Sequence, residues 1–250
     1  MSTVRDTWLI YTRAMTINLN NPFWVIIGLL QPIIYLVLFA PLLEGMGLGA
    51  NAYNIFVPGL LVLNAMFGSL FVGFGLLQEL GEGVIERMRV TPISRLSMLL
   101  GRVFRDITTF LFQSLILLVL AIPFGLDVNV GGAILTFLML ILIGLVLAPL
   151  SYAIALAVKT LDGFAGFINM FSLPLMLLSG ILLPINDFTA PGWLVAIAKV
   201  NPFYYAVEGV RALFVGDFGN SNLWIGVGLM AALAVLLLVI GARAFGRAVR

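Results

Sequence analysis

Residues 133–158 read AILTFLMLILIGLVLAPLSYAIALAV and contain no Asp, Glu, Lys or Arg. A helix needs about 20 consecutive apolar residues to cross the hydrocarbon core of a bilayer. This stretch is long enough to do so, and its interior offers no charge that would have to be solvated. We therefore predict that it spans a membrane as an α-helix.

The composition of the whole chain extends this prediction. Of the 250 residues, 62% are hydrophobic and only 10% are charged, whereas soluble domains carry about 25% charged residues. Further apolar segments cover residues 23–43, 55–77, 107–124, 164–183 and 223–240. We expect an all-α integral membrane protein with six transmembrane helices, folded as one domain over residues 1–250.

The missing residue types exclude several classes of function. The chain has no His and no Cys, so imidazole metal sites, thiolate chemistry and disulfides are excluded. A P-loop needs Gly-x-x-x-x-Gly-Lys-Ser/Thr, and neither Lys159 nor Lys199 lies in such a motif. A net charge of +2 gives no support for nucleic-acid binding. We expect no metal site, no bound cofactor and no enzymatic activity in this chain.

The predicted spans also lack a titratable residue near their middle. Asp106, Asp127 and Asp162 all fall at predicted span ends. Carriers coupled to protons or sodium usually place such a residue near the midplane of the bilayer. Energy for active transport would then have to come from another chain.

Residues 1–20 are predicted to form a helix on the membrane surface. The apolar face consists of Val4, Trp8, Tyr11, Met15 and Leu19, and the opposite face carries Arg5, Asp6, Arg13 and Asn20. An apolar face with a Trp is typical of interfacial helices. The alternative is a helix docked on another part of the protein.

The distribution of positive charge predicts the orientation. Arginines cluster near both termini and in residues 87–105, and few cations lie in the other connections. Cytoplasmic loops carry the excess of Lys and Arg. We expect both termini to be cytoplasmic, in a bacterial or archaeal inner membrane.

A charged cytoplasmic segment, residues 79–100, joins the second and third predicted spans. Gly81 and Gly83 permit a sharp departure from the second span, and residues 84–90 can form a short helix that Pro92 ends. Thr91 as N-cap and Pro92 at the first helical position would start the next helix. The alternative is a solvated loop.

Between the fifth and sixth spans, residues 185–219 are interrupted by polar residues and prolines too often for a straight span. We expect two short helices here, at residues 193–199 and 203–214, packed at or dipping into the interface.

Two groups of motifs resemble a known family. The runs EGVIER (residues 82–87) and VTPISR (90–95) resemble the signature of type 2 ABC exporter permeases. This family includes drug exporters of the daunorubicin-resistance type and polysaccharide exporters. LSGILLP (178–184), PGWL (191–194), NPF (201–203) and EGVR (208–211) resemble its downstream region. The resemblance extends in order over essentially the whole chain.

This resemblance implies roles for specific residues. The ATPase-coupling residues would be Glu82, Gly83, Glu86, Arg87, Arg89, Val90, Thr91, Pro92, Ile93 and Ser94. An extracellular gate, within a re-entrant segment at residues 185–219, would include Pro184, Trp193, Asn201, Pro202, Glu208 and Arg211. Candidate residues for the wall of a substrate pathway are Tyr35, Phe39, Asn64, Phe67, Phe71, Asn169, Met170 and Leu173.

The resemblance also implies partners. Two copies of an ABC ATPase subunit would bind ATP and Mg, and a second permease copy, or a close paralogue, would pair with this chain in membrane lipid. Spans one and five would form the contact between the permeases. The expected function is ATP-driven export of a hydrophobic or amphipathic substrate. The alternatives are a permease for a lipid-linked glycan and a non-transporting membrane scaffold or sensor of an ATPase complex.

Overall fold

The computed structural model describes residues 3–20, 23–43, 52–83, 94–185 and 190–248. Every regular element within these ranges is a helix. In chain order they are α1 (Thr3–Asn20), α2 (Phe23–Leu43), α3 (Ala52–Leu70), α4 (Val72–Gly81), α6 (Arg95–Ala121), the 3-10 turn η3 (Ile122–Phe124), α7 (Val130–Val158), α8 (Leu161–Leu178), α9 (Gly192–Val200), α10 (Pro202–Val215) and α11 (Ser221–Ala248). The predicted all-α fold class is confirmed for the described part of the chain.

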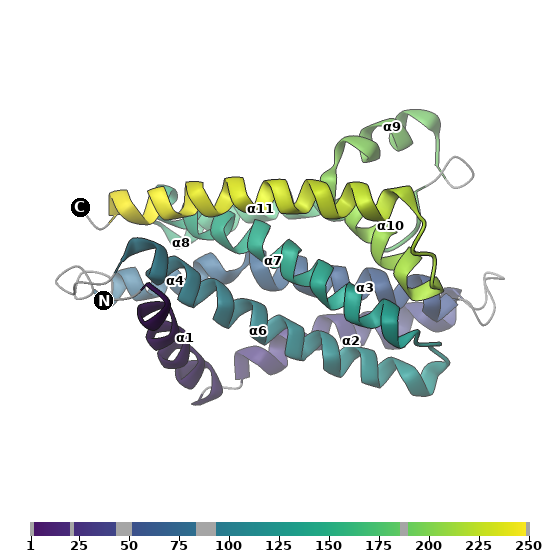
Figure 1. Ribbon diagram of the computed structural model, residues 1–250, viewed down its shortest axis with the longest axis horizontal. Helices are drawn as coiled ribbons and strands as arrows, with labels where there is room; N and C mark the ends of the chain where they lie inside the picture. The colour runs from purple at the N-terminus through teal and green to yellow at the C-terminus, as the bar shows by residue number, and fades with distance from the viewer. Residues whose placement is uncertain (1–2, 21–22, 44–51, 84–93, 186–189, 249–250) are drawn as a thin grey trace.

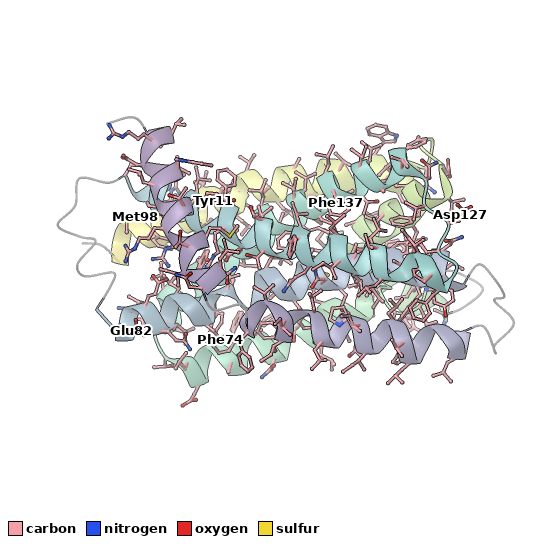
Figure 2. The ribbon with its side chains drawn as sticks, turned by 90° about the horizontal axis from the view of Figure 1, so that it is seen from below. Tyr11, Phe74, Glu82, Met98, Asp127 and Phe137 are labelled. Atoms are coloured by element: carbon pink, nitrogen blue, oxygen red, sulfur yellow. The ribbon has the colours of Figure 1, made fainter. Side chains whose placement is uncertain are left out.

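The long helices lie side by side in an elongated bundle, and both termini lie at the same end of it (Figure 1). We call this end the near end and the opposite one the far end. Glu82 and Met98 lie toward the near end and Asp127 at the far end (Figure 2). Among the described residues, five segments are long and apolar enough to span a membrane, namely Tyr53–Gly81, Leu96–Phe124, Val130–Val158, Leu161–Leu178 and Ser221–Gly246. A sixth results if α1 and α2 are counted together as one bent span.

The centre of the bundle is formed by α3 and α7, which are the most buried of these spans. Helix α7 packs along α11, and α3 packs against both α6 and α7. Their contacts are filled by aliphatic side chains such as Leu60, Val103 and Ile143, which are fully buried. Because lipid tails are as apolar as these side chains, close packing stabilises the contacts more than exclusion of water does.

The two short helices predicted between the fifth and sixth spans are confirmed as α9 and α10. Helix α10 lies among α3, α7 and α11, and most of its residues are buried. A Cβ atom at Gly132 of α7 would lie 1.9 Å from the carbonyl oxygen of Leu213, so glycine is needed where α7 crosses α10. In contrast, α9 stands away from the long helices (Figure 1).

Three predicted boundaries were wrong. The helix leading into the third span was predicted to start at Pro92 with Thr91 as N-cap, but α6 begins at Arg95 and its N-cap is Ser94, whose side chain accepts from the Ser97 N–H at 3.1 Å. Helix α8 ends at Leu178, earlier than residue 183, because Gly180 adopts φ of 71° just beyond it. Helix α11 continues into the basic tail and ends at Ala248.

The predicted second span, residues 55–77, is not one continuous helix. Helix α3 ends at Leu70 and α4 begins at Val72. Helix α4 then continues to Gly81, which brings it to the start of the charged segment.

Helix α1 packs on α6, as the second reading of residues 1–20 expected. Asp6, Thr7 and Ile10 are buried, and a Cβ atom at Gly101 of α6 would lie 2.7 Å from Ile10. The helix is therefore docked on α6 through a side that includes Asp6. Trp8 on the predicted apolar face is 62% exposed.

Candidate functional site

Charged side chains gather inside the near end of the bundle, where α4, α6 and α7 meet. We call this cluster the near-end junction, and it consists of Glu79 on α4, Arg102, Arg105 and Asp106 on α6, and Tyr152 on α7. Charged residues are almost never fully buried unless they are paired. The pairing in this cluster explains how the candidate span Leu96–Phe124 carries three charges.

Helices α4 and α6 are joined by an ion pair. The Nη2 of Arg102 donates to Oε2 of Glu79 at 2.5 Å. The Arg102 side chain is only 5% exposed, whereas that of Glu79 is 34% exposed. The guanidinium is thus held inside the bundle, and the carboxylate reaches it from the bundle surface. These two helices are the ones that bound residues 84–93.

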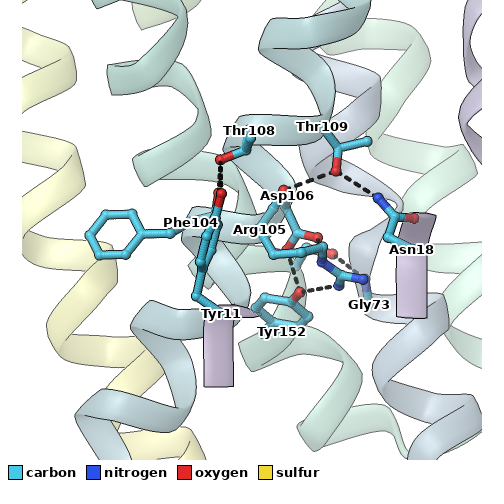
Figure 3. Close-up of polar contacts among 10 residues, drawn as sticks. Tyr11, Asn18, Gly73, Phe104, Arg105, Asp106, Thr108, Thr109 and Tyr152 are labelled. Carbon is cyan, nitrogen blue, oxygen red and sulfur yellow. Dashed lines mark hydrogen bonds and ion pairs between the residues drawn. The ribbon is translucent and has the colours of Figure 1, made fainter. Parts of the chain in front are cut away.

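Helices α6 and α7 are joined by a buried carboxylate (Figure 3). The Oδ1 of Asp106 lies 2.7 Å from Nε of Arg105, and the Tyr152 hydroxyl donates a short hydrogen bond to Oδ2 of Asp106. A buried carboxylate is tolerated when a cation and further hydrogen bonds satisfy it. The Tyr152 ring also packs edge-on against Phe245 of α11, with the centroids 6.0 Å apart.

Helix α1 is tied to the same region of α6. The hydroxyls of Tyr11 and Thr108 are 3.4 Å apart, and Asn18 Nδ2 donates to Oγ1 of Thr109 at 2.8 Å (Figure 3). The Ser97 hydroxyl donates to the Thr3 carbonyl at 3.0 Å. Polar contacts therefore link α1, α4, α6 and α7 into one unit at the near end.

A second polar cluster lies toward the far end, and we call it the far-end junction. It is centred on Arg211 of α10, which is 7% exposed. Its Nη2 donates to the carbonyls of Gly180 and Ile181 at 2.7 and 3.0 Å, and its Nε donates to the Ile55 carbonyl at 3.1 Å. Its Nη1 donates to Oε1 of Glu208 at 2.8 Å. One guanidinium thus joins α10 to the start of α3 and to the chain just beyond α8.

Asn201 supplies another link between α8 and α10. Its Oδ1 accepts from the Phe203 N–H at 3.0 Å, which caps α10, and its Nδ2 donates to the Leu175 carbonyl of α8 at 3.2 Å. Asn, with Pro at the next position, is a strong helix-start signal.

The predicted coupling residues are only partly described. Glu82 and Gly83 directly follow α4, and Gly83 has φ of 67°, which supports the predicted sharp departure. Ser94 caps α6. The other predicted coupling residues lie outside the described residues: Glu86, Arg87, Arg89, Val90, Thr91, Pro92 and Ile93.

The predicted pathway residues lie on α2, α3, α8 and the break between α3 and α4. Phe39 stacks on Phe56 at 5.9 Å and Phe67 on Phe71 at 5.6 Å. Asn169, Met170 and Leu173 are exposed on α8, and Tyr35 is half-buried on α2. Asn64 differs, because it is 4% exposed and its Nδ2 donates to the Phe110 carbonyl and the Ser114 hydroxyl of α6.

The predicted gate residues separate into two groups. Glu208 and Arg211 are paired in the far-end junction, whereas Asn201 and Pro202 form the start of α10. Trp193 is 66% exposed on α9, and Pro184 is half-buried after the end of α8.

The near-end junction was missed in the sequence, although a signal was present. Asp106 falls at helical spacing with Leu99, Val103 and Phe110, all of which are buried. A carboxylate on the apolar stripe of a helix indicates a buried partner. The predicted span began at residue 107 and therefore left Asp106 out. Within the described ranges, no three His, Cys, Asp or Glu side chains are grouped so that they could hold a metal ion.

The sequence of this chain is similar to those of known transport proteins. The ABC-2 type transporter family matches residues 5–215. A protein of Cyanophora paradoxa that carries the name transport permease is 28% identical over 84% of this chain and 74% of its own. A daunorubicin resistance ABC transporter permease protein of Streptomyces coeruleorubidus is 25% identical over 90% of this chain and 81% of its own. A Mycobacterium tuberculosis protein named as a doxorubicin resistance ABC transporter permease is 24% identical over 85% of this chain and 78% of its own.

Proposed function

The chain belongs to the ABC-2 type transporter family as a membrane permease subunit of an ABC transporter, and we propose that it exports a hydrophobic or amphipathic substrate from the cell. The substrate would be drug-like or lipid-like, because two relatives carry names that refer to resistance to daunorubicin and doxorubicin. ATP and Mg would be bound by a separate ABC ATPase subunit.

The observation that carries the proposal is the construction of the near-end junction. The Glu79–Arg102 pair joins the two helices that bound residues 84–93, and Asp106 with Tyr152 extends the connection to α7. A push on the segment between α4 and α6 would therefore reach the central helix α7 through paired charges. Such a link suits the transfer of work from an ATPase into a membrane bundle.

We assign the near end to the cytoplasm and the membrane to the inner membrane of a bacterium or archaeon. Arg5, Arg13, Lys159 and Arg243 belong to α1, the α7–α8 connection and the end of α11, which lie toward the near end. Excess Lys and Arg on one side of a membrane marks the cytoplasmic side.

The assembly would contain two permease chains and two ATPase subunits. Helix α8 buries only Phe164, Ile168 and Ser172, and α2 and α8 expose large apolar side chains such as Val37 and Leu173. Contact with a second permease copy would cover part of this surface. The substrate would pass along the face of α2, α3 and α8 that carries the predicted pathway aromatics, and the far-end junction would close its outer end.

Partner identity can be tested by affinity purification. The tagged chain would be extracted gently from membranes of the cells that contain it, and mass spectrometry would search for a P-loop ATPase near one-to-one. We expect such a subunit to be recovered, and to be lost when residues 82–94 are scrambled in a chain that still inserts. The matched control is Asp127→Asn at the far end, which should retain the ATPase. A functional preparation without any ATPase would contradict the proposed function.

Coupling can be tested by transport. We expect Glu82→Ala and Arg87→Ala to abolish ATP-driven uptake of doxorubicin into inside-out vesicles while the complex still assembles. The Asp127→Asn variant should transport like the unaltered chain. Full transport by both variants would refute the assignment of the coupling segment. ATPase binding without any effect of candidate substrates on hydrolysis would instead favour the non-transporting scaffold.

A further inference from the structure

The break between α3 and α4 involves a side chain from another helix. Sharp kinks in helices normally trace to Pro, to Gly/Ser pairs, to a π-bulge, or to a side chain or water inserted into the hydrogen-bond ladder. Gly68 and Ser69 form such a pair just before the break, and a side chain is inserted as well. The prolines nearest to Phe71 in the sequence are Pro58 and Pro92, too far along the chain to account for it. The inserted group is the hydroxyl of Ser151 on α7, which donates to the Leu70 carbonyl at 2.6 Å and accepts from the Gly73 N–H at 3.0 Å.

This hydroxyl takes the place of two backbone partners. In a continuous helix, the Leu70 carbonyl would accept from the Phe74 N–H, and the Gly73 N–H would donate to Ser69. In the structure, the Phe74 N–H donates to the Phe71 carbonyl at 3.1 Å. Hydrocarbon offers no water to freed backbone groups. The arrangement bound to Ser151 satisfies these groups, and an uninterrupted helix would satisfy them as well.

Helix α8 packs against the break between α3 and α4. A Cβ atom at Gly73 would lie 2.3 Å from the ring of Phe164, and the Phe74 and Phe164 rings meet edge-on with centroids 4.8 Å apart. Phe164 is fully buried on a helix that buries little else. A change in the direction of α4 at this point would therefore displace Phe164 and, with it, α8.

The opposite end of α4 carries the ion pair between α4 and α6 in the near-end junction. Glu79, which pairs with Arg102, lies near the last turn of α4, and Glu82 follows the helix. Helix α4 is thus a short lever. One end is held by Ser151 and the other by an ion pair beside the predicted coupling segment.

We propose that the break at Phe71 is a hinge on which α4 turns together with α8, and that Ser151 is the positioning residue that holds this hinge bent. The inference rests on the proposed function, because ATPase movements at residues 84–93 would supply the force on α4. Ser151 touches no substrate in this account. It acts by fixing the direction of α4 in one of the two states.

The test uses distances measured by pulsed electron spin resonance. The chain has no native Cys, so spin labels can be placed at Gln78→Cys on α4 and Ala157→Cys on α7, both exposed positions. A control pair joins Ala157→Cys to Phe104→Cys on α6, which is also exposed. Labelled chains are diluted with unlabelled ones in lipid nanodiscs, with the ATPase subunit bound, before and after ATP trapping.

We expect ATP to shift the α4–α7 distance while the α6–α7 distance stays unchanged. Without nucleotide, Ser151→Ala should already shift or broaden the α4–α7 distribution, because the bent state loses both of its added hydrogen bonds. Ser151→Thr keeps the hydroxyl and should restore the distribution of the unaltered chain. The matched control Ser172→Ala removes a buried hydroxyl that bonds only within α8, at 3.4 Å to the Asn169 carbonyl, and should change nothing.

An unchanged α4–α7 distribution in Ser151→Ala would overturn the hinge and make the break a static feature. This comparison needs no nucleotide, so it tests the hinge even if no ATPase binds. Failure to recover an ATPase would defeat the proposed function and not the two-state break. ATP-driven transport with no change in the α4–α7 distance would defeat the hinge and leave the proposed function intact.

Discussion

Replacing Arg211 by Met should loosen the far-end junction. The Met side chain retains an apolar stem of similar length but donates no hydrogen bonds. The carbonyls of Ile55, Gly180 and Ile181 would each lose a donor that now lies 2.7 to 3.1 Å away. Glu208 would lose its cation.

The magnitude follows from those three carbonyl contacts. Interhelical hydrogen bonds in a membrane protein contribute about 0.6 kcal/mol each on average. The loss of three makes local opening easier by about 2 kcal/mol, which corresponds to a roughly 30-fold larger open population. Bonds from a charged donor are stronger than neutral ones, but removal of a buried guanidinium also recovers its desolvation cost. These two effects oppose each other, so each of the three hydrogen bonds is assigned the average of about 0.6 kcal/mol.

The assay is the reactivity of a single buried thiol. Ile181 is fully buried beside Arg211, so Ile181→Cys in this cysteine-free chain reacts with a membrane-permeant maleimide only when the junction opens. Arg211→Met should raise the labelling rate roughly 30-fold in proportion to the open population. The control, Arg243→Met, changes an exposed arginine at the near end and should leave the rate unaltered. Equal rates in the two variants would refute the view that Arg211 holds these elements together.

Three further predictions can be tested by reversible unfolding in detergent. Gly132→Ala places a Cβ 1.9 Å from a backbone oxygen and should cost about 1–3 kcal/mol, whereas Gly228→Ala meets nothing within 4 Å and should cost nothing. Equal stabilities would show that α7 and α10 can separate freely. Glu79→Gln leaves the buried Arg102 without its carboxylate and should cost about 3 kcal/mol. Arg102→Met leaves a carboxylate that reaches water and should cost about 1 kcal/mol or less, and the reverse order would contradict the burial argument. Tyr152→Phe removes the donor to a buried carboxylate and should cost about 1.5–3 kcal/mol; an unchanged free energy of unfolding would mean that this bond contributes nothing.

The candidate site could be predicted from the sequence only where local signals define it. Asn201 before Pro202 is a helix start that can be seen in the sequence, and α10 begins there. Gly83 was expected at a turn and has positive φ. Arg102 and Asp106, however, were placed outside the predicted span, in the helix leading into it, because charge was taken to exclude a residue from a span. Their partners Glu79 and Tyr152 lie 23 and 46 residues away in the chain, and no local pattern shows that such charges are neutralised.

The helical class and the multi-pass character were determined by the sequence itself, because a segment of about 20 uncharged apolar residues can satisfy its backbone in hydrocarbon only by forming a helix. That requirement acts within each segment and needs no knowledge of its neighbours. The break at Phe71 shows the opposite case. The ladder between α3 and α4 is interrupted where a hydroxyl 81 residues from Leu70 binds the Leu70 carbonyl, and Arg211 is buried because carbonyls of two distant segments meet it. Only the tertiary structure decides such features, since their stability depends on polar partners that folding alone brings together.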